Sequence, residues 1–321
     1  MITMAHGGGG IETKKLISET FAKYFKNDHD SDAAILGVSP KVAFTTDSFV
    51  VKPLVFPGGD IGRLAVCGTV NDLLTAGAKP LYLSAGFIIG EGLSLDTLDA
   101  VCRSMAGAAD EAGVRVVTGD TKVVEGSGGL YINTSGLGVF DSEPITLDRV
   151  RVGDALIVTG TLGEHHACIL SRRLNLSNDI QSDAAPLTAI AAALKDAQIP
   201  IHGMRDVTRG GLATVLAEIA ESTGFAAEIH EKLLPISPEV AAFCGILGLD
   251  PLYMGNEGKM LIIVPEECSQ MALNIIKSSD YGRKAAIIGA IQQGKRPIMV
   301  TRLGGRRILP PLLGEGLPRI C

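Results

Sequence analysis

The sequence predicts an α/β (α+β) protein of two domains, and three of its general features support this prediction. The chain has 321 residues, more than one ordinary hydrophobic core encloses. Hydrophobic residues make up 46% and charged residues 20%, so the chain can bury a large core. Aromatic residues supply only 4% while glycine reaches 39 residues, a balance typical of aliphatic cores joined by many tight turns.

The first half of the chain alternates short apolar runs with amphipathic segments. In chain order, the spacing predicts a helix at 16–24, strands at 33–36 and 42–51, a helix at 61–76, a strand at 81–89, a helix at 95–112, and strands at 114–118 and 129–140. The helix at 61–76 is followed by Gly77 and Pro80, which favour a helix C-terminus. We expect residues 1–150 to form the first domain.

The pattern of strands and helices restarts after residue 150, so we expect a second domain over residues 151–305. It comprises a strand at 155–159, helices at 164–173, 186–197 and 212–221, a strand at 261–264, a helix at 268–278 and a strand at 286–290. The remaining residues, 306–321, hold three prolines and two glycines. This composition indicates a flexible tail ending in Cys321.

Charge and cysteine usage exclude several classes of protein. The net charge of −6 and the absence of a long basic cluster argue against nucleic-acid binding. No apolar run approaches the roughly 18–20 residues that cross a bilayer, and the first ten residues do not resemble a signal peptide. The six cysteines lie far apart without a C-x-x-C pair, which argues against zinc or disulfides and favours the reducing cytoplasm.

Four aspartates form the first candidate site. Asp72 projects within about 20° of Ile61 and Ala65 on its predicted helix, so its carboxylate shares the inward apolar stripe. Such an acid lies either at the margin of the stripe or in a cleft where a cation offsets its desolvation. Three further acids follow predicted strands, where aspartates also form turns, namely Asp47, Asp120 and Asp206. Together the four suggest ligands for a hard cation bound to a nucleotide phosphate.

A phosphate site is expected at one helix N-terminus. The sequence contains neither a P-loop nor a strand–G-x-G-x-x-G–helix unit. The run Arg209-Gly210-Gly211 directly precedes the helix at 212–221, where unpaired N–H groups favour an anion; an ordinary glycine-rich turn is the alternative.

Three residues are candidates for chemistry itself. Cys321 lies on the Pro/Gly-rich tail, so its sulfur is able to enter and leave a cleft, and we interpret it as a carrier that is activated only when docked. His165 and His166 point about 100° apart on a helix, which favours a capping or cleft role for one of them over a metal pair. Glu257 lies in a loop beside a strand, where a solvated turn residue is the alternative.

Several motifs, in order along nearly the whole chain, resemble those of the HypE family of hydrogenase maturation factors. That family belongs to the superfamily of aminoimidazole ribonucleotide synthetase, the PurM-like proteins. The matching motifs are His6-Gly7-Gly8-Gly9-Gly10, Thr46-Asp47-Ser48-Phe49-Val50-Val51, Pro57-Gly58-Gly59-Asp60-Ile61-Gly62, Gly68-Thr69-Val70-Asn71-Asp72-Leu73, Gly119-Asp120-Thr121-Lys122-Val123-Val124, Met204-Arg205-Asp206-Val207-Thr208-Arg209-Gly210-Gly211 and Pro318-Arg319-Ile320-Cys321. Two departures are Gly90, where a second Glu is expected, and His166, where a Gly is usual; the second leaves His165 as the family residue.

The resemblance implies a PurM-like fold, a homodimer built through the N-terminal domains, and ATP in a cleft between domains. It also implies a reaction: a carbamoyl group carried on Cys321 is dehydrated to a thiocyanate, which supplies cyanide to the iron of [NiFe]-hydrogenases. The carbamoyl donor would be the carbamoyltransferase HypF, and the acceptor the HypC–HypD complex.

The same resemblance assigns roles to the motif residues. Cys321, Lys122, Glu257 and His165 are expected to be catalytic, with Glu257 the first candidate for the base and His165 the second. Mg²⁺ is expected on acids that neutralise the transferring phosphoryl group, namely Asp47, Asp72, Asp120 and Asp206. ATP and its phosphates are expected at Asp47, Asn71, Asp72, Asp120, Thr121, Lys122, Arg209, Gly210 and Gly211.

Two other functions are weighed against this one. Selenophosphate synthetase is a similar ATP-using enzyme, but it works through a reactive Cys or Sec near its N-terminus, and this sequence has no cysteine before Cys67. A metal chaperone would use His6, His165, His166 and Cys321, but the sequence lacks clustered Cys/His spacing.

Overall fold

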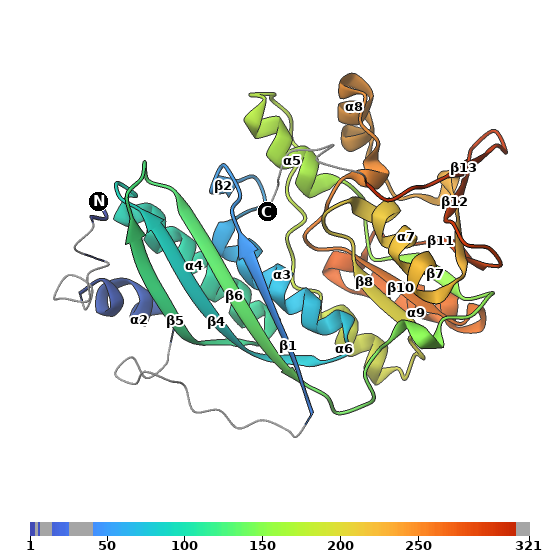
Figure 1. Ribbon diagram of the computed structural model, residues 1–321, viewed down its shortest axis with the longest axis horizontal. Coiled ribbons are helices and arrows are strands. Elements are labelled where there is room, and N and C mark those ends of the chain that lie inside the picture. The colour runs from blue at the N-terminus through green and yellow to red at the C-terminus, as the bar shows by residue number, and fades with distance from the viewer. Residues whose placement is uncertain (4–5, 7–14, 26–40, 313–321) are drawn as a thin grey trace.

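The computed structural model describes residues 1–3, 6, 15–25 and 41–312 (Figure 1). The strand predicted at 33–36 and the candidate Cys321 therefore lie outside the described residues. The predicted helix at 16–24 is a π-helix, Ile17–Phe21, continued by α2, Ala22–Tyr24. No helix in the described ranges has both the length and the apolar character that crossing a membrane requires.

The N-terminal domain is a four-stranded sheet with two long helices on one face (Figure 1). The strand order is β1-β6-β4-β5, and only β4 and β5 are parallel. The strands are β1 (Val42–Phe49), β4 (Lys79–Gly90), β5 (Arg115–Val124) and β6 (Leu130–Val139), and a hairpin of β2 (Val55–Phe56) and β3 (Gly59–Asp60) leads into the helices α3 (Ile61–Thr75) and α4 (Leu95–Ala112).

Side-chain caps explain where the two long helices begin. The Asp60 carboxylate accepts hydrogen bonds from the N–H groups of Gly62 and Arg63 at the start of α3, and the Ser94 hydroxyl accepts one from Thr97 at the start of α4. Helix α4 ends at Gly113, whose φ of 71° is in the left-handed region.

The other face of this sheet carries exposed apolar side chains. Phe44 is 71% exposed, and Ile88 and Val124 are also exposed. The helices α3 and α4 lie behind the sheet, on the opposite face (Figure 1). Phe44 and Ile88 lie toward opposite ends of this face, because Phe44 is level with Tyr82, six residues before Ile88.

The C-terminal domain is a seven-stranded sheet of order β13-β12-β9-β11-β7-β10-β8, in which only β12 and β9 are parallel. Its strands are β7 (Ala155–Val158), β8 (Gly203–Asp206), β9 (Ala226–His230), β10 (Met260–Val264), β11 (Ala286–Gln292), β12 (Ile298–Val300) and β13 (Arg306–Ile308). Its helices are α5 (Glu164–Arg173), α6 (Thr188–Asp196), α7 (Gly211–Thr223), α8 (Pro238–Leu247) and α9 (Glu266–Ser278).

The predicted start of the tail at residue 306 is wrong. Arg306–Ile308 form β13, which pairs with β12, and the next residue, Leu309, is fully buried. The chain stays attached to the domain further on, because the Tyr253 hydroxyl donates to the Pro310 carbonyl and the Leu312 N–H donates to the Thr214 hydroxyl. The prolines that predicted a tail follow this last strand rather than replace it.

Candidate functional site

Three of the predicted acids meet where the two domains adjoin. Asp47 comes from β1, Asp72 from α3 and Asp206 from the end of β8, and we call them the acid cluster. Thr45 and Asp47 lie on the face of β1 that is turned toward α3, and the Thr45 hydroxyl donates to Asp72 Oδ2 at 2.9 Å. The structure thus brings together acids that are 25 and 134 residues apart in the sequence.

Burial raises the pKa of every member of the acid cluster, and repulsion from other members adds to the rise for Asp47 and Asp72. Loss of solvent is the largest cause for each of them. For Asp72, burial first and then the charges of Asp206 and Asp47 raise the pKa to about 6. Arg209 lies near enough to Asp47 to oppose this rise there. A cation bound among these carboxylates would remove the repulsion that their ionised forms suffer.

The acid cluster fits Mg²⁺ better than a metal that needs a full set of protein ligands. No three His, Cys, Asp or Glu side chains in the described part of the chain are grouped so that they could hold one ion. Mg²⁺ does not require such a group, because it is usually held by one or two carboxylates, water and substrate phosphates.

The predicted phosphate site lies at the start of α7. Gly210 and Gly211 have φ values of 82° and 63°, and a Cβ on Gly211 would lie 2.4 Å from the Leu252 carbonyl oxygen, so the turn requires glycine. No side chain caps this helix N-terminus. Asp206 and Arg209 precede this turn by a few residues, and an uncapped helix N-terminus is suited to an anion.

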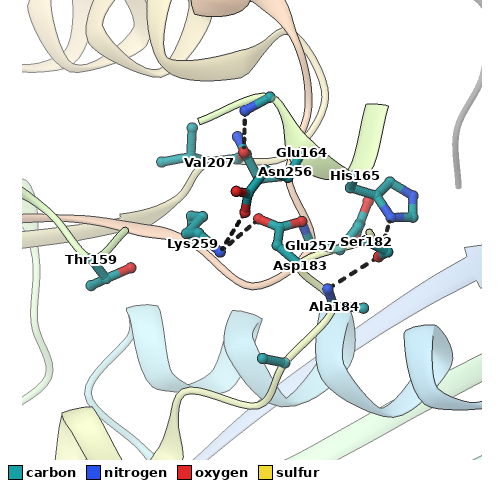
Figure 2. Close-up of polar contacts among 12 residues, drawn as sticks. Thr159, Glu164, His165, Ser182, Asp183, Ala184, Val207, Asn256, Glu257 and Lys259 are labelled. Atoms are coloured by element: carbon teal, nitrogen blue, oxygen red, sulfur yellow. Dashed lines mark hydrogen bonds and ion pairs between the residues drawn. The ribbon is translucent and has the colours of Figure 1, made fainter. Parts of the chain in front are cut away.

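A second polar cluster surrounds Lys259, and it was not predicted. The Lys259 ammonium lies 2.9 Å from Asp183 Oδ2 and 3.9 Å from Glu164 Oε2, and Asp183 Oδ1 accepts the backbone N–H of Glu257 at 3.1 Å (Figure 2). Glu257 and Lys259 are 4% and 8% exposed. We call Glu164, Asp183, Glu257 and Lys259 the Lys259 cluster. The interpretation of Glu257 as a solvated turn residue is wrong, because the loop is packed into the domain junction.

His165 lies beside the Lys259 cluster, and its neighbour is a core residue. His165 Nδ1 is 2.7 Å from the Ser182 hydroxyl, which accepts the Ala184 N–H (Figure 2). Ser182 thus links the His165 ring to the backbone at Ala184, next to Asp183. Burial lowers the pKa of His166 to about 4, and its Nδ1 accepts the Gly255 N–H at 3.4 Å.

Asn71, predicted to contact ATP, joins the two domains. Its side-chain N–H group donates to the carbonyls of Ala185 at 3.0 Å and Glu257 at 3.4 Å, and its carbonyl accepts the Leu187 N–H at 3.0 Å. The amide of Asn71 is buried in these contacts, so it fixes the residues around Glu257 against α3.

The structure separates Asp120, Thr121 and Lys122 from both clusters within one chain. Asp120 and Lys122 form an exposed ion pair of 2.7 Å on β5, at the opposite edge of the sheet from β1. Three strand spacings place that edge about 14 Å from Asp47. Thr121 points to the other face, beside buried Phe87, because neighbouring residues of a strand alternate. Within one chain, these three predicted ligands therefore lie apart from the acid cluster.

Cavities give no competing candidate close to these residues. A cavity of about 410 Å³ borders the Lys259 cluster and is lined by Glu164, Ser182 and Lys259, among others. A larger one of about 590 Å³ lies at the far end of α3, around Leu74 and Ile199, away from every predicted site residue.

Comparison with known proteins decides the family. The family described as "AIR synthase related protein" matches at residues 30–140 with its N-terminal domain and at 151–302 with its C-terminal domain. The carbamoyl dehydratase HypE of Rhodobacter capsulatus is 46% identical over 334 residues, covering 100% of this chain and 98% of that protein. The chain belongs to the HypE family. The HypE of Escherichia coli K12 is 41% identical, covering 100% of this chain and 99% of its own.

Solved structures of HypE have the same fold. The crystal structure of hydrogenase maturation protein HypE in complex with ATP has a TM-score of 0.96 at 43% identity and covers 100% of both chains. A chain of the HypE–HypF complex has a TM-score of 0.82 at 44% identity, covering 92% of this chain and 99% of that one. The predicted HypE resemblance, PurM-like α/β fold and enzyme class are confirmed.

Proposed function

We propose that the protein uses ATP to dehydrate a carbamoyl group carried on Cys321 to a thiocyanate, as the source of cyanide for a [NiFe]-hydrogenase. The observation that carries this proposal is the acid cluster beside the uncapped N-terminus of α7, a pairing of carboxylates and N–H donors that suits a metal-bound phosphate. The HypE structure that contains ATP, 43% identical, supports nucleotide binding.

The reaction explains why ATP is needed. The carbamoyl oxygen is a poor leaving group, so it attacks the γ-phosphorus and the bond to ADP breaks. The nitrogen then loses its two protons as the C≡N bond forms, and the C–O bond breaks with release of phosphate. In sum, thiocarbamate and ATP give thiocyanate, ADP, phosphate and one proton.

Different residues of this chain act in the different steps of this reaction. Asp47, Asp72 and Asp206 would hold Mg²⁺, which supplies charge neutralisation for phosphoryl transfer when it is bound. The α7 N-terminus and Arg209 bind phosphate oxygens. Glu257 accepts the amide protons, with His165 as the second candidate. Burial of Glu257 keeps bulk water away from the activated carbamoyl group.

The role proposed for Lys122 requires a second copy of the chain. Asp120 and Lys122 lie on the sheet face that exposes Phe44 and Ile88, so a homodimer built on this face would cover the apolar surface. Such a dimer would also place Lys122 of one chain near the nucleotide bound by the other chain. HypF would deliver the carbamoyl group, as the HypE–HypF complex supports, and HypC–HypD would receive the cyanide.

Intact mass of the C-terminal peptide tests the reaction. After incubation with HypF, carbamoyl phosphate, ATP and Mg²⁺, the unsubstituted chain should show the carbamoylated tail and then a product lighter by one water. Cys321→Ala should show neither, whereas Cys268→Ala, a partly exposed cysteine outside both clusters, should behave as the unsubstituted chain. A Cys321→Ala chain that still yields thiocyanate would refute the proposal.

Mixing two inactive variants tests the shared site. If Lys122 acts across the dimer, chains carrying Lys122→Met and chains carrying Glu257→Gln should together recover activity, because one of the two sites in the mixed dimer is intact. If both residues act within one chain, every site in the mixture stays defective and no activity returns.

A further inference from the structure

The Lys259 cluster contains a buried ion pair that fold stability does not explain. Lys259 and Asp183 are 8% and 1% exposed along their side chains, and their charged atoms are 2.9 Å apart. Desolvation of two charges commonly offsets their attraction, so a buried ion pair of this kind is weak evidence for a contribution to stability. Its location is therefore informative: Asp183 binds the backbone N–H of the proposed base, Glu257, and Lys259 follows Glu257 by two residues in the same loop.

The segment that carries Asp183 is held in place without Lys259. The Asn71 amide binds Ala185 and Leu187, and Arg63 Nε donates to the Ala184 carbonyl at 2.7 Å. Gly258 also packs directly on this segment, since a Cβ there would lie 2.0 Å from the Asp183 carbonyl oxygen. These contacts already fix the loop around Glu257 against the segment that carries Asp183. We therefore infer that the Lys259 ammonium acts through its charge rather than by holding the loop in place.

We propose that Asp183 and Lys259 are positioning residues for Glu257, with Asp183 fixing its backbone and Lys259 keeping its carboxylate ionised. Asp183 uses a different oxygen for each contact: Oδ1 accepts the Glu257 N–H, and Oδ2 forms the ion pair with the Lys259 ammonium (Figure 2). This assignment rests on the proposed function, in which Glu257 must be ionised in order to accept a proton.

The sign of the effect follows from the charges that surround Glu257. The cluster holds three carboxylates and one ammonium, so removal of the ammonium leaves no cation within the cluster to oppose its like charges. Cys67 on α3 lies near both Glu257 and Asp183, a group of Arg63, Glu111 and Tyr281 lies beside Cys67, and His165 binds Ser182 next to Asp183. The adjoining cavity of about 410 Å³ is lined by Glu164, Asp183 and Lys259 but not by Glu257.

Single-turnover rates on the full chain, with its tail already carbamoylated, test the proposal. In Lys259→Met the rate of thiocyanate formation at pH 6 should fall about tenfold, while KM for ATP is unchanged and the acidic limb of the pH profile moves to higher pH. Lys259→Arg, which keeps the charge, should recover the rate to within about threefold. A rate loss without movement of the limb would show that Lys259 is merely structural.

A double variant and a direct titration cover the case in which a single change unfolds the protein. Lys259→Met with Asp183→Asn removes both charges but keeps an oxygen for the Glu257 N–H, so folding and the wild-type pH profile should return together. Labelling the protein with ¹³C-glutamate allows NMR to follow the titration of the Glu257 carboxyl, whose signal is identified by its loss in Glu257→Gln. This measurement does not need turnover, so it can be made even if the proposed reaction is wrong. An unchanged Glu257 titration in Lys259→Met would overturn the inference.

Discussion

The acid cluster and the Lys259 cluster both gather carboxylates that repel one another when ionised, but they differ in whether the chain supplies a buried cation to neutralise them. Each places three carboxylates at the junction of the two domains. The Lys259 cluster includes its own buried cation, 2.9 Å from Asp183. In the part of the chain that the structure describes, the cations that act on the acid cluster are Arg209, near Asp47, and Arg205, near Asp206, and the pKa of all three acids is raised nonetheless.

The difference shows which cluster is complete and which depends on a ligand. A set of charges neutralised by the chain itself can be fixed by packing, as the backbone contacts around Glu257 are. Buried carboxylates without a neighbouring cation are less stable ionised than protonated, and a bound metal ion reverses this preference. We therefore expect the Lys259 cluster to respond to changes in packing and the acid cluster to changes in charge and pH.

The largest expected effect is on packing in the Lys259 cluster. Gly258→Ala introduces a Cβ 2.0 Å from the Asp183 carbonyl oxygen, so the free energy of unfolding should fall by about 3 kcal/mol. Urea denaturation measures it. Gly107→Ala is the matched control, because Gly107 lies in α4 with no atom within 4 Å of the added carbon, and it should stabilise by up to about 1 kcal/mol. If Gly258→Ala and Gly107→Ala change the free energy of unfolding equally, the loop around Gly258 is not tightly packed.

The next effect is on charge in the acid cluster. The raised pKa of Asp72, about 6, means that its ionised form costs stability above pH 6 and that this cost disappears below about pH 4. Asp72→Asn should therefore raise the free energy of unfolding by about 1–2 kcal/mol at pH 7 and by nothing at pH 4, while abolishing thiocyanate formation. Urea denaturation at the two pH values, beside the activity assay, distinguishes this from a general stabilisation. A loss of stability at pH 7 would contradict the repulsion.

The smallest expected effect is that of the metal ion itself. With saturating ADP present throughout, Mg²⁺ at five times its Kd should stabilise the protein by about 1 kcal/mol at pH 8. At pH 5 the effect should largely vanish, because protonation of Asp72 competes with the metal. Thermal unfolding measures both, and the Asp72→Asn chain should show no pH-dependent difference. Equal stabilisation at both pH values would place the metal elsewhere.

Sequence periodicity predicted most of the long elements, although it missed α8, and it missed several of the short ones. Helix α4 has the predicted bounds, Leu95–Ala112, because its apolar positions recur over five turns. The strands β8, β12 and β13 have three or four residues each, too few for a period to emerge. Tertiary pairing within the seven-stranded sheet, rather than local pattern, fixes them.

The same limit applies to the site. Asp72 was predicted from helix geometry, and the inward stripe does lead to other acids. Asp120, Thr121 and Lys122 were expected at one site because they belong to one motif of the family, but alternation along a strand sends neighbours to opposite faces. Asp183 and Lys259 escaped prediction because a polar stretch and a strand-edge lysine are typical of surfaces, and only the packing of α3 against the second domain buries them.

The attachment of residues 310–312 to Tyr253 and Thr214 has a consequence for the concentration of the substrate. Cys321 is the ninth residue after Leu312, so even an extended chain keeps its thiol within about 30 Å of Leu312. A group confined to that distance is present at an effective concentration in the millimolar range. In the proposed reaction, the active site therefore needs almost no affinity for the carbamoyl group on Cys321. Weak binding also lets the finished thiocyanate leave for an outside acceptor without a large free-energy cost.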